Sequence, residues 1–176
     1  MVTSRPFAAP AARAPAATAM SDLIELFFFA YRDFVGDADR LLEYYRFGRA
    51  HHRVLHFVNR RPGLTIAELL DILKITKQSL NRVLKDLLDQ DFVEARTGIA
   101  DRRQRLLHAT QRGRRLAQDL THLQSERFER ALGELPDSAR GAAVAFLLAV
   151  IDPAEREAIT RFVWRDEDAP RGAEAP

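Results

Sequence analysis

The segment from Thr65 to Ala109 constrains the fold more than any other part of this 176-residue sequence. It opens with Thr65-Ile66-Ala67-Glu68, which fits a capping box: the threonine hydroxyl accepts an amide of the first helical turn, and the glutamate reaches back to the threonine amide. Apolar residues follow at helical spacing until the pattern breaks at Lys74-Ile75: Ile66, Leu69, Leu70 and Leu73. The sequence therefore predicts a short helix from about Ile66, followed by a turn.

A second helix follows directly, with Thr76 as its N-cap candidate. Its apolar positions form one stripe: Leu80, Val83, Leu84, Leu87 and Leu88. Its N-terminus and opposite face carry polar and basic side chains: Thr76, Lys77, Gln78, Ser79, Asn81, Arg82 and Lys85. Side chains of these types read base edges in the major groove of DNA, so this helix is a candidate recognition helix. An ordinary solvated helix face is the simpler alternative.

Two short strands are expected after this helix, over residues 92–96 and 105–109. The loop between them, residues 97–104, contains a glycine and a basic tip with Asp101, Arg102 and Arg103. Two strands around a basic loop are typical of the wing of a winged helix-turn-helix. The expected fold class is therefore mainly α with a small β-hairpin wing, in which further helices flank the winged helix-turn-helix on both sides.

Positive charge is concentrated on the same part of the chain. The overall charge is only +2, but residues 74–115 hold eleven Lys or Arg against five Asp or Glu, a net of +6. The remaining residues hold sixteen against twenty, a net of −4. A DNA-binding protein needs such a basic segment, because it must displace the counterions of the phosphate backbone. A solvated surface gives the same pattern more often, so charge alone does not decide between the two.

The flanking segments predict a disordered tail over 1–20, an N-terminal dimerisation helix over 21–48, the winged helix-turn-helix domain over 49–110, linker and C-terminal dimerisation helices over 111–165, and a loose tail over 166–176. The first helix either breaks or continues at Gly36-Asp37. The segment 138–151 is apolar nearly all round, which indicates burial against other helices. Asp152-Pro153 has the N-cap and N1 residues of a last helix that runs to about Trp164.

These helices carry more apolar surface than one small three-helix core can cover, so a homodimer is expected. A twofold dimer would place two recognition helices about one DNA turn apart, roughly 34 Å, and would read a pseudo-palindrome.

The order of these helices, together with Asp101-Arg102-Arg103 and the following segment 106–113 (Leu-Leu-His-Ala-Thr-Gln-Arg-Gly), resembles the MarR family of bacterial transcription regulators over about residues 21–164. The resemblance implies that residues 76–90 form the recognition helix. It also implies that Arg103 enters the minor groove, braced by Asp101, with Arg102 as the alternative tip residue. It further implies a homodimer, built from the first and last helices, that represses or less often activates genes and is released by a small ligand.

In such a protein the effector site opens between the dimer helices and the DNA-binding lobe. The candidates there are polar or aromatic, and would suit a small aromatic acid: Tyr31, Tyr44, Tyr45, Arg46, Arg49 and His51. The alternative is that these tyrosines only pack and the arginines are solvated. His52 and His56 share a helix face at a spacing that can hold a metal, which leaves a metal-responsive regulator as an alternative, although no third ligand can be identified.

Other function classes find little support in the sequence. It has no cysteine, which excludes disulfides and thiol-based sensing, and a reducing cytoplasm is compatible with this. No apolar run approaches a membrane span. We find no phosphate-binding glycine loop, metalloprotease motif or nucleophile elbow, so neither an enzyme nor a bound cofactor is expected. A winged helix used only for protein contacts is the remaining alternative.

Overall fold

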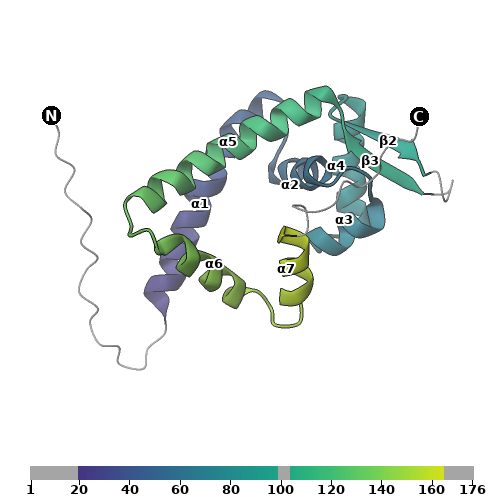
Figure 1. The fold of residues 1–176 in the computed structure, drawn as a ribbon. Helices are drawn as coiled ribbons and strands as arrows, with labels where there is room; N and C mark the ends of the chain where they lie inside the picture. The colour runs from purple at the N-terminus through teal and green to yellow at the C-terminus, as the bar shows by residue number, and fades with distance from the viewer. Residues whose placement is uncertain (1–19, 99–103, 165–176) are drawn as a thin grey trace, which may run out of the picture. The chain divides into compact units, whose positions relative to one another are not determined.

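The computed structural model of the protein describes residues 20–98 and 104–164. Its elements, in chain order, are α1 (Ser21–Tyr44), α2 (Arg49–Arg60), β1 (Leu64–Thr65), α3 (Ile66–Leu73), α4 (Lys77–Asp89), β2 (Val93–Thr97), β3 (Arg105–Ala109), α5 (Gln111–Gly133), α6 (Ala139–Val150) and α7 (Arg156–Trp164) (Figure 1). The expected class, mainly α with a small β-hairpin, is confirmed. The chain divides after Phe128 into two units, which are described separately.

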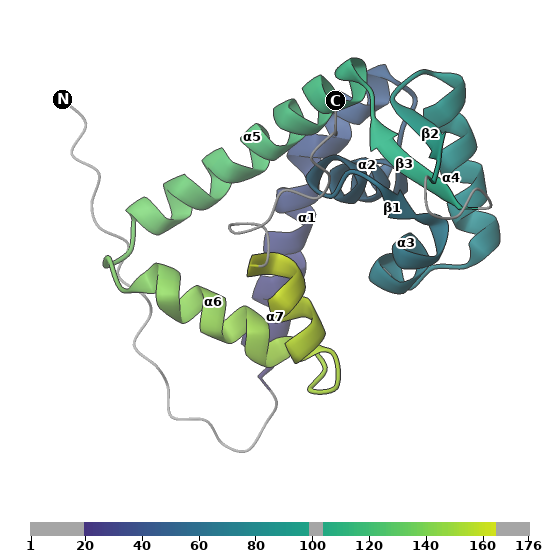
Figure 2. The ribbon, with the colours of Figure 1, turned by 45° about the vertical axis from the view of Figure 1, so that its right-hand side comes forward.

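The first unit contains the winged lobe, in which α2, α3 and α4 lie beside an antiparallel sheet (Figure 2). The strand order is β1-β3-β2, so β3 is central and pairs Leu64 with Leu107 on one side and Val93 with Ala109 on the other. Strand β1 was not predicted from the sequence. With only two residues it shows no alternation, and it follows directly on the turn at Pro62-Gly63, where the Gly63 amide donates to the Leu107 carbonyl at 2.8 Å.

One apolar core fills this lobe and extends into the second half of α1 and the start of α5. Its largest fully buried side chains come from α1, all three lobe helices, the sheet and α5: Phe92, Leu42, Leu55, Leu69, Leu80, Leu87, Leu107 and Leu120. Because every element of the lobe contributes to the same core, burial of apolar surface fixes these elements as one body.

Helix α5 begins unusually close to the lobe, at Gly113. A Cβ built on this glycine would lie 1.9 Å from the Phe92 carbonyl oxygen and 3.4 Å from a Leu55 methyl. Real Cβ atoms do not approach a backbone oxygen so closely, so only glycine fits here. The absence of a side chain thereby sets how α5 leaves the winged lobe.

Helix α1 continues through Gly36-Asp37 without a break. Its buried residues, Val35, Ala38 and Leu42, all lie in its second half, and Phe34 contacts Phe128 of α5 with ring centroids 5.2 Å apart. The large apolar side chains of its first half are exposed: Leu23, Ile24, Leu26, Phe27, Phe28, Phe29 and Tyr31.

The second unit, from Glu129 onward, differs from two expectations. Helix α6 has no buried residue within this chain, so the burial predicted from its composition is not provided by the chain itself. Helix α7 begins at Arg156 rather than at Pro153, because the Asp152 carboxylate accepts the Ala154 amide at 2.9 Å and forms a turn before the helix. Among the described residues, no helix is both long and apolar enough to cross a membrane.

Candidate nucleic-acid interface

Helix α3 and the turn after it orient the candidate recognition helix. The predicted capping box is confirmed: the Glu68 amide donates to Thr65 Oγ1 at 3.2 Å, and the Thr65 amide donates to Glu68 Oε2 at 2.8 Å. The helix ends at Lys74, whose φ of 49° is left-handed and whose amide donates to the Leu70 carbonyl. This left-handed residue ends the first helix sharply, so that Thr76 can begin the second.

Helix α4 has its polar side chains outside and its apolar side chains inside. Thr76 is its N-cap, as predicted, and accepts the Ser79 amide at 3.2 Å. The four buried residues are Leu80, Val83, Leu84 and Leu87, whereas Leu88, placed in the stripe from sequence, is exposed because it has turned past the core-facing side. The predicted DNA-contacting side chains of this helix are all exposed: Thr76, Lys77, Gln78, Ser79, Asn81, Arg82 and Lys85. The first half of α4 thus presents donors to solvent.

The basic side chains of α4 differ in their partners. Lys85 Nζ lies 2.8 Å from Asp89 Oδ2, and this hydrogen bond, with the attraction of the carboxylate, raises the pKa of Lys85. Within residues 20–98 and 104–164, neither Lys77 nor Arg82 pairs with a carboxylate. These two cations are therefore the better placed to meet a phosphate or a base.

The wing is an antiparallel hairpin whose register runs from Val93 opposite Ala109 to Thr97 opposite Arg105. The pairing extends one step further, since the Gly98 amide donates to the Gln104 carbonyl at 3.0 Å. The predicted tip residues Asp101, Arg102 and Arg103 lie outside the described residues. The hairpin therefore carries this basic loop on a paired stem.

The side chains of Thr110 and Arg112, here called the clasp, join the end of α4 to the start of α5. Thr110 Oγ1 donates to the Asp91 carbonyl at 2.7 Å and accepts the Gly113 amide at 3.0 Å. The Arg112 guanidinium lies 4.3 Å from the Phe92 ring centre and donates to the Gln90 carbonyl, at the C-terminus of α4, at 2.9 Å. A cation at a helix C-terminus is favourable because unpaired carbonyls gather there. The clasp fixes the end of the candidate recognition helix against the wing and α5.

This arrangement, two capped helices at a sharp turn and a hairpin behind them, can be compared with known proteins. The MarR family model matches residues 47–104, which span α2 to the wing. Over 133 residues the chain is 47% identical to the HTH-type transcriptional regulator PetP of Rhodobacter capsulatus, covering 76% of this chain and 80% of PetP. The chain belongs to the MarR family. It is accordingly an HTH-type transcription regulator, and its family is one of regulators rather than of enzymes.

Solved MarR structures share the fold. CouR from Rhodococcus jostii RHA1, bound to p-coumaroyl-CoA, superposes with a TM-score of 0.64 at 20% identity, covering 78% of this chain and 97% of CouR. The S. aureus MepR-DNA complex superposes with a TM-score of 0.60 at 18% identity, covering 76% of this chain and 97% of MepR. At these identities the likeness concerns the fold, and it extends from the winged lobe to the flanking helices.

Among the candidate effector residues of this MarR protein, Tyr44 and Tyr45 contact each other with ring centroids 5.0 Å apart. Tyr45 packs edge-on against Phe92 (centroids 5.3 Å apart), and Tyr44 is 83% exposed. Arg49 pairs with Asp39, His51 contacts Asp86, Arg46 is exposed in the turn after α1, and Tyr31 lies on the exposed first half of α1. A cavity of about 200 Å³ lies elsewhere, at the base of the wing, and is lined by Asn59, Pro62, Arg96, His108, Ala109 and Arg114.

The two candidate metal ligands, His52 and His56, lie with ring centroids 6.4 Å apart. Burial lowers the pKa of His52 to about 4, and the neighbouring His56 adds to this effect. Burial also lowers the pKa of His56. Within the part of the chain that the structure describes, no group of three or more His, Cys, Asp or Glu is arranged to hold a metal. The pair therefore consists of two half-buried histidines on one face of α2, and burial disfavours the charged form of each.

Three contacts made by α4 or by its neighbour α2 were not predicted from the sequence. These are the His51–Asp86 contact, the Arg112 cap and the Asp39–Arg49 pair. Each joins residues ten or more positions apart, and no local spacing rule predicts such a pair. Only the Thr110-x-x-Gly113 pattern gave a signal, because it marks a helix start.

Proposed function

We propose that this MarR protein is a ligand-responsive, homodimeric repressor that binds a pseudo-palindromic DNA operator, with recognition helix 76–90 in the major groove. The observation that carries the proposal is the outward face of the first half of α4, where Lys77, Gln78, Asn81 and Arg82 are all exposed. These side chains can donate to guanine and adenine edges, and Arg82 can do so with two parallel bonds. Phosphate contacts would supply most of the affinity and base contacts the choice of sequence.

Homodimerisation is supported by the exposed apolar first half of α1. Its side chains Phe27, Phe28 and Phe29 are each 50% or more exposed in the single chain. Three successive aromatic residues face different sides of a helix, so a large part of the helix surface needs cover. A twofold partner supplies that cover and sets the separation of the two recognition helices.

The wing supplies the second DNA contact in this proposal. Arg103 would enter the minor groove beside the operator half-site, with Asp101 bracing it and Arg102 as the alternative reader. The support is the resemblance in the segment 101–113 and the paired stem that carries the loop. An arginine in a narrow minor groove is attracted by the enhanced negative potential there.

Release by a small ligand is supported by the structural relatives. CouR was solved bound to p-coumaroyl-CoA, and MepR was solved as a DNA complex. For this chain we infer a small organic effector near the junction of α1 and α2, where Tyr44, Tyr45 and Arg46 lie at the end of α1 and Arg49 and His51 lie in the first turn of α2. Such a ligand acts by favouring a dimer whose lobes are spaced wrongly for DNA, and its effect is limited by its differential affinity for the two forms.

The proposal is tested by selecting DNA fragments from a genomic library with the purified protein and measuring the binding of the Arg82→Ala variant to a selected fragment. We expect Arg82→Ala to weaken binding by about 1–3 kcal/mol, because a base or phosphate contact is lost. The control is Arg140→Ala, which removes one exposed positive charge from α6 and should have little effect.

Two results would contradict the proposal. Equal losses for Arg82→Ala and Arg140→Ala would remove Arg82 from the DNA interface. Failure of the wild-type protein to enrich any fragment would favour a winged helix that binds only proteins.

A further inference from the structure

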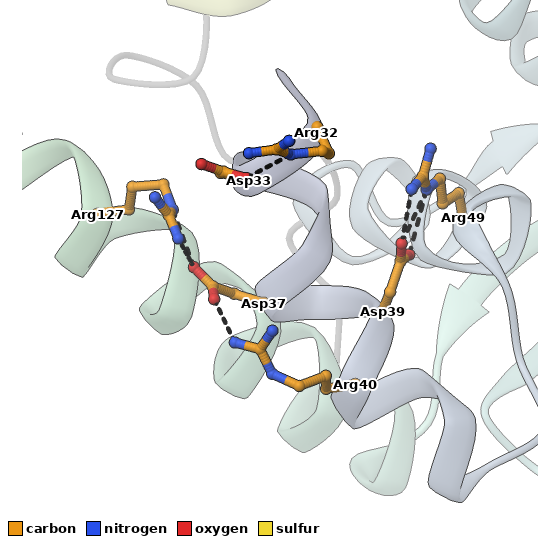
Figure 3. A network of polar contacts seen from close by, with 7 residues as sticks. All are labelled: Arg32, Asp33, Asp37, Asp39, Arg40, Arg49 and Arg127. Carbon is orange, nitrogen blue, oxygen red and sulfur yellow. Dashed lines mark hydrogen bonds and ion pairs between the residues drawn. The ribbon is translucent and has the colours of Figure 1, made fainter. Parts of the chain in front are cut away.

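The first turn of α2 lies between α1 and the recognition helix and makes a polar contact with each. On one side, Arg49 Nη2 lies 2.8 Å from Asp39 Oδ2 of α1 (Figure 3). On the other side, His51 Nε2 lies 3.1 Å from Asp86 Oδ2 of α4. Two positions of one helical turn therefore hold two different helices.

The hydrogen bonds of His51 fix its tautomer. The Gly48 amide donates to His51 Nδ1 at 3.1 Å. An amide can only donate, so Nδ1 must be the bare, accepting nitrogen and the proton must reside on Nε2. Nε2–H then points at the Asp86 carboxylate and donates to it. The contact is thus a directed hydrogen bond from a neutral imidazole to a carboxylate.

The imidazole is also held in place by packing. It stacks on the Phe47 ring with centroids 4.7 Å apart and an interplanar angle of 9°. Phe47 is itself buried and packs edge-on against Phe92, at 5.0 Å. The His51 side chain is only 14% exposed. Because stacking and the Gly48 bond fix the ring plane, the position of the imidazole determines where Asp86, and with it α4, can lie while the contact is kept.

Asp86 is a sensitive point on α4, because it lies one helical turn after Arg82 on the same side. The apolar stripe of Leu80, Val83, Leu84 and Leu87 holds α4 on the lobe, but apolar contact is not directional. A hydrogen bond loses strength when its angle changes. The bond to Asp86 therefore limits rotation of α4 about its own axis, which determines where Arg82 points.

Helix α1 is connected to this turn and to α5. Arg127 of α5 approaches Asp37 Oδ2 at 2.6 Å, and its hydrogen bond lowers the pKa of Asp37. Figure 3 shows Asp37 and Asp39 directed to different sides of α1, the first toward Arg127 and the second toward Arg49. Asp37 and Asp39 thus join α1 to α5 on one side and to the first turn of α2 on the other.

From this geometry we propose that His51 is a positioning residue for the recognition helix, and that the Asp39–Arg49 pair links it to α1. The inference rests on the proposed DNA-reading function and adds a residue that touches no DNA. His51 sets the rotation of α4 through Asp86, and Asp39 sets the position of the turn that carries His51.

The test compares affinity for a DNA fragment selected by the wild-type protein with affinity for a shuffled fragment of the same length and composition. The ratio of the two affinities is used because loss of the Asp86 charge strengthens binding to any DNA and cancels in the ratio. We expect His51→Ala and Asp86→Ala each to lower the ratio about fivefold, the effect of one hydrogen bond of ordinary strength. The double variant should lose no more than either single variant.

Two further variants separate positioning from general damage. Asp86→Asn removes the same charge but keeps an oxygen that accepts Nε2–H, so we expect it to retain the wild-type ratio. His122→Ala is the matched control, because His122 pairs with Glu126 inside a single helix at 3.3 Å and joins no two elements. Circular dichroism identifies any variant that fails to fold, and if His51→Ala does, Asp86→Ala against Asp86→Asn still decides.

Several outcomes would overturn the inference. Ratios for His51→Ala and Asp86→Ala equal to that of His122→Ala would do so, as would an Asp86→Asn loss as large as that of Asp86→Ala. The link to α1 is overturned if Asp39→Ala leaves the ratio unchanged. It is also overturned if the two substitutions act independently, so that the double variant of Asp39→Ala and His51→Ala lowers the ratio by the product of the two single effects. A wild-type protein with no preference between the fragments would instead refute the proposed function.

Discussion

The winged lobe and the first half of α1 belong to one unit but treat apolar residues in opposite ways. In the lobe, Leu55, Leu80 and Phe92 are fully buried by neighbours in the same chain. In α1, Phe28 is 65% exposed, although Leu42 of the same helix is completely buried. The apolar side chains of the lobe are therefore buried within one chain, whereas those at the start of α1 are not. Stability of the lobe and assembly of the protein should accordingly be separable by mutation.

The largest effect is expected where the lobe is tightest, at Gly113. We predict that Gly113→Ala lowers the free energy of unfolding by at least about 3 kcal/mol, because its Cβ would meet the Phe92 carbonyl oxygen and α5 would have to move. Urea unfolding measures the change.

Gly36→Ala is the matched control for this substitution, since Gly36 lies inside α1 with nothing within 4 Å of a built Cβ. It should stabilise the protein by up to about 1 kcal/mol through helix propensity. If Gly113→Ala changed the free energy of unfolding no more than Gly36→Ala does, the junction of Phe92 and α5 would be loosely packed.

The exposed first half of α1 is tested with Phe28→Ser. If a second copy covers this surface, the variant should weaken dimerisation by about 2 kcal/mol for each subunit, the transfer free energy of one large apolar side chain. Light scattering over a range of concentrations measures the monomer–dimer equilibrium. The control is Tyr44→Ser. Tyr44 is also an exposed aromatic residue of α1, at 83% exposure, but it lies at the end of the helix next to the lobe. Equal dimer constants for the two variants would show that dimers form through another surface.

The same contrast explains what the sequence could predict. The caps at Thr65 and Thr76 and the stripe from Leu80 to Leu87 are local patterns, so the helices and turn of the lobe followed from them. The two residues of β1 are too short to show a pattern. The sequence placed the start of α7 at Pro153, but the helix begins at Arg156, because Asp152 caps a turn as well as it caps a helix.

The candidate site was predictable to a similar extent. The exposed side chains of α4 follow from helical periodicity once the buried stripe is known. The contacts that His51 and Arg112 make with this helix depend on distant parts of the chain meeting in space. The candidate effector residues follow from the resemblance to the MarR family, which indicates where a pocket opens but not the partner of each side chain. Arg49 pairs with an acidic residue of α1, and Tyr45 packs on the aromatic core.

The smallest expected effect concerns pH and again concerns the lobe. His52 on α2 has its pKa lowered by burial to about 4, against an ordinary value of 6.5 in the unfolded chain. Well above pH 6.5 the residue is neutral in both states and does not affect stability. As pH falls from 6.5 toward 4, His52 binds a proton in the unfolded chain but not in the folded lobe. The free energy of unfolding therefore decreases. Because His52 is partly exposed, we expect a loss of about 1 kcal/mol between pH 7 and pH 5.

Urea unfolding at the two pH values should show this loss in the wild-type protein and a smaller one in His52→Gln, with His56 contributing the remainder. His122→Gln, on the exposed face of α5, is the control and should leave the pH dependence as it is. If His52→Gln leaves it equally unchanged, solvent reaches His52 in the folded lobe, and the packing of α2 is looser on that face than on the face that carries His51.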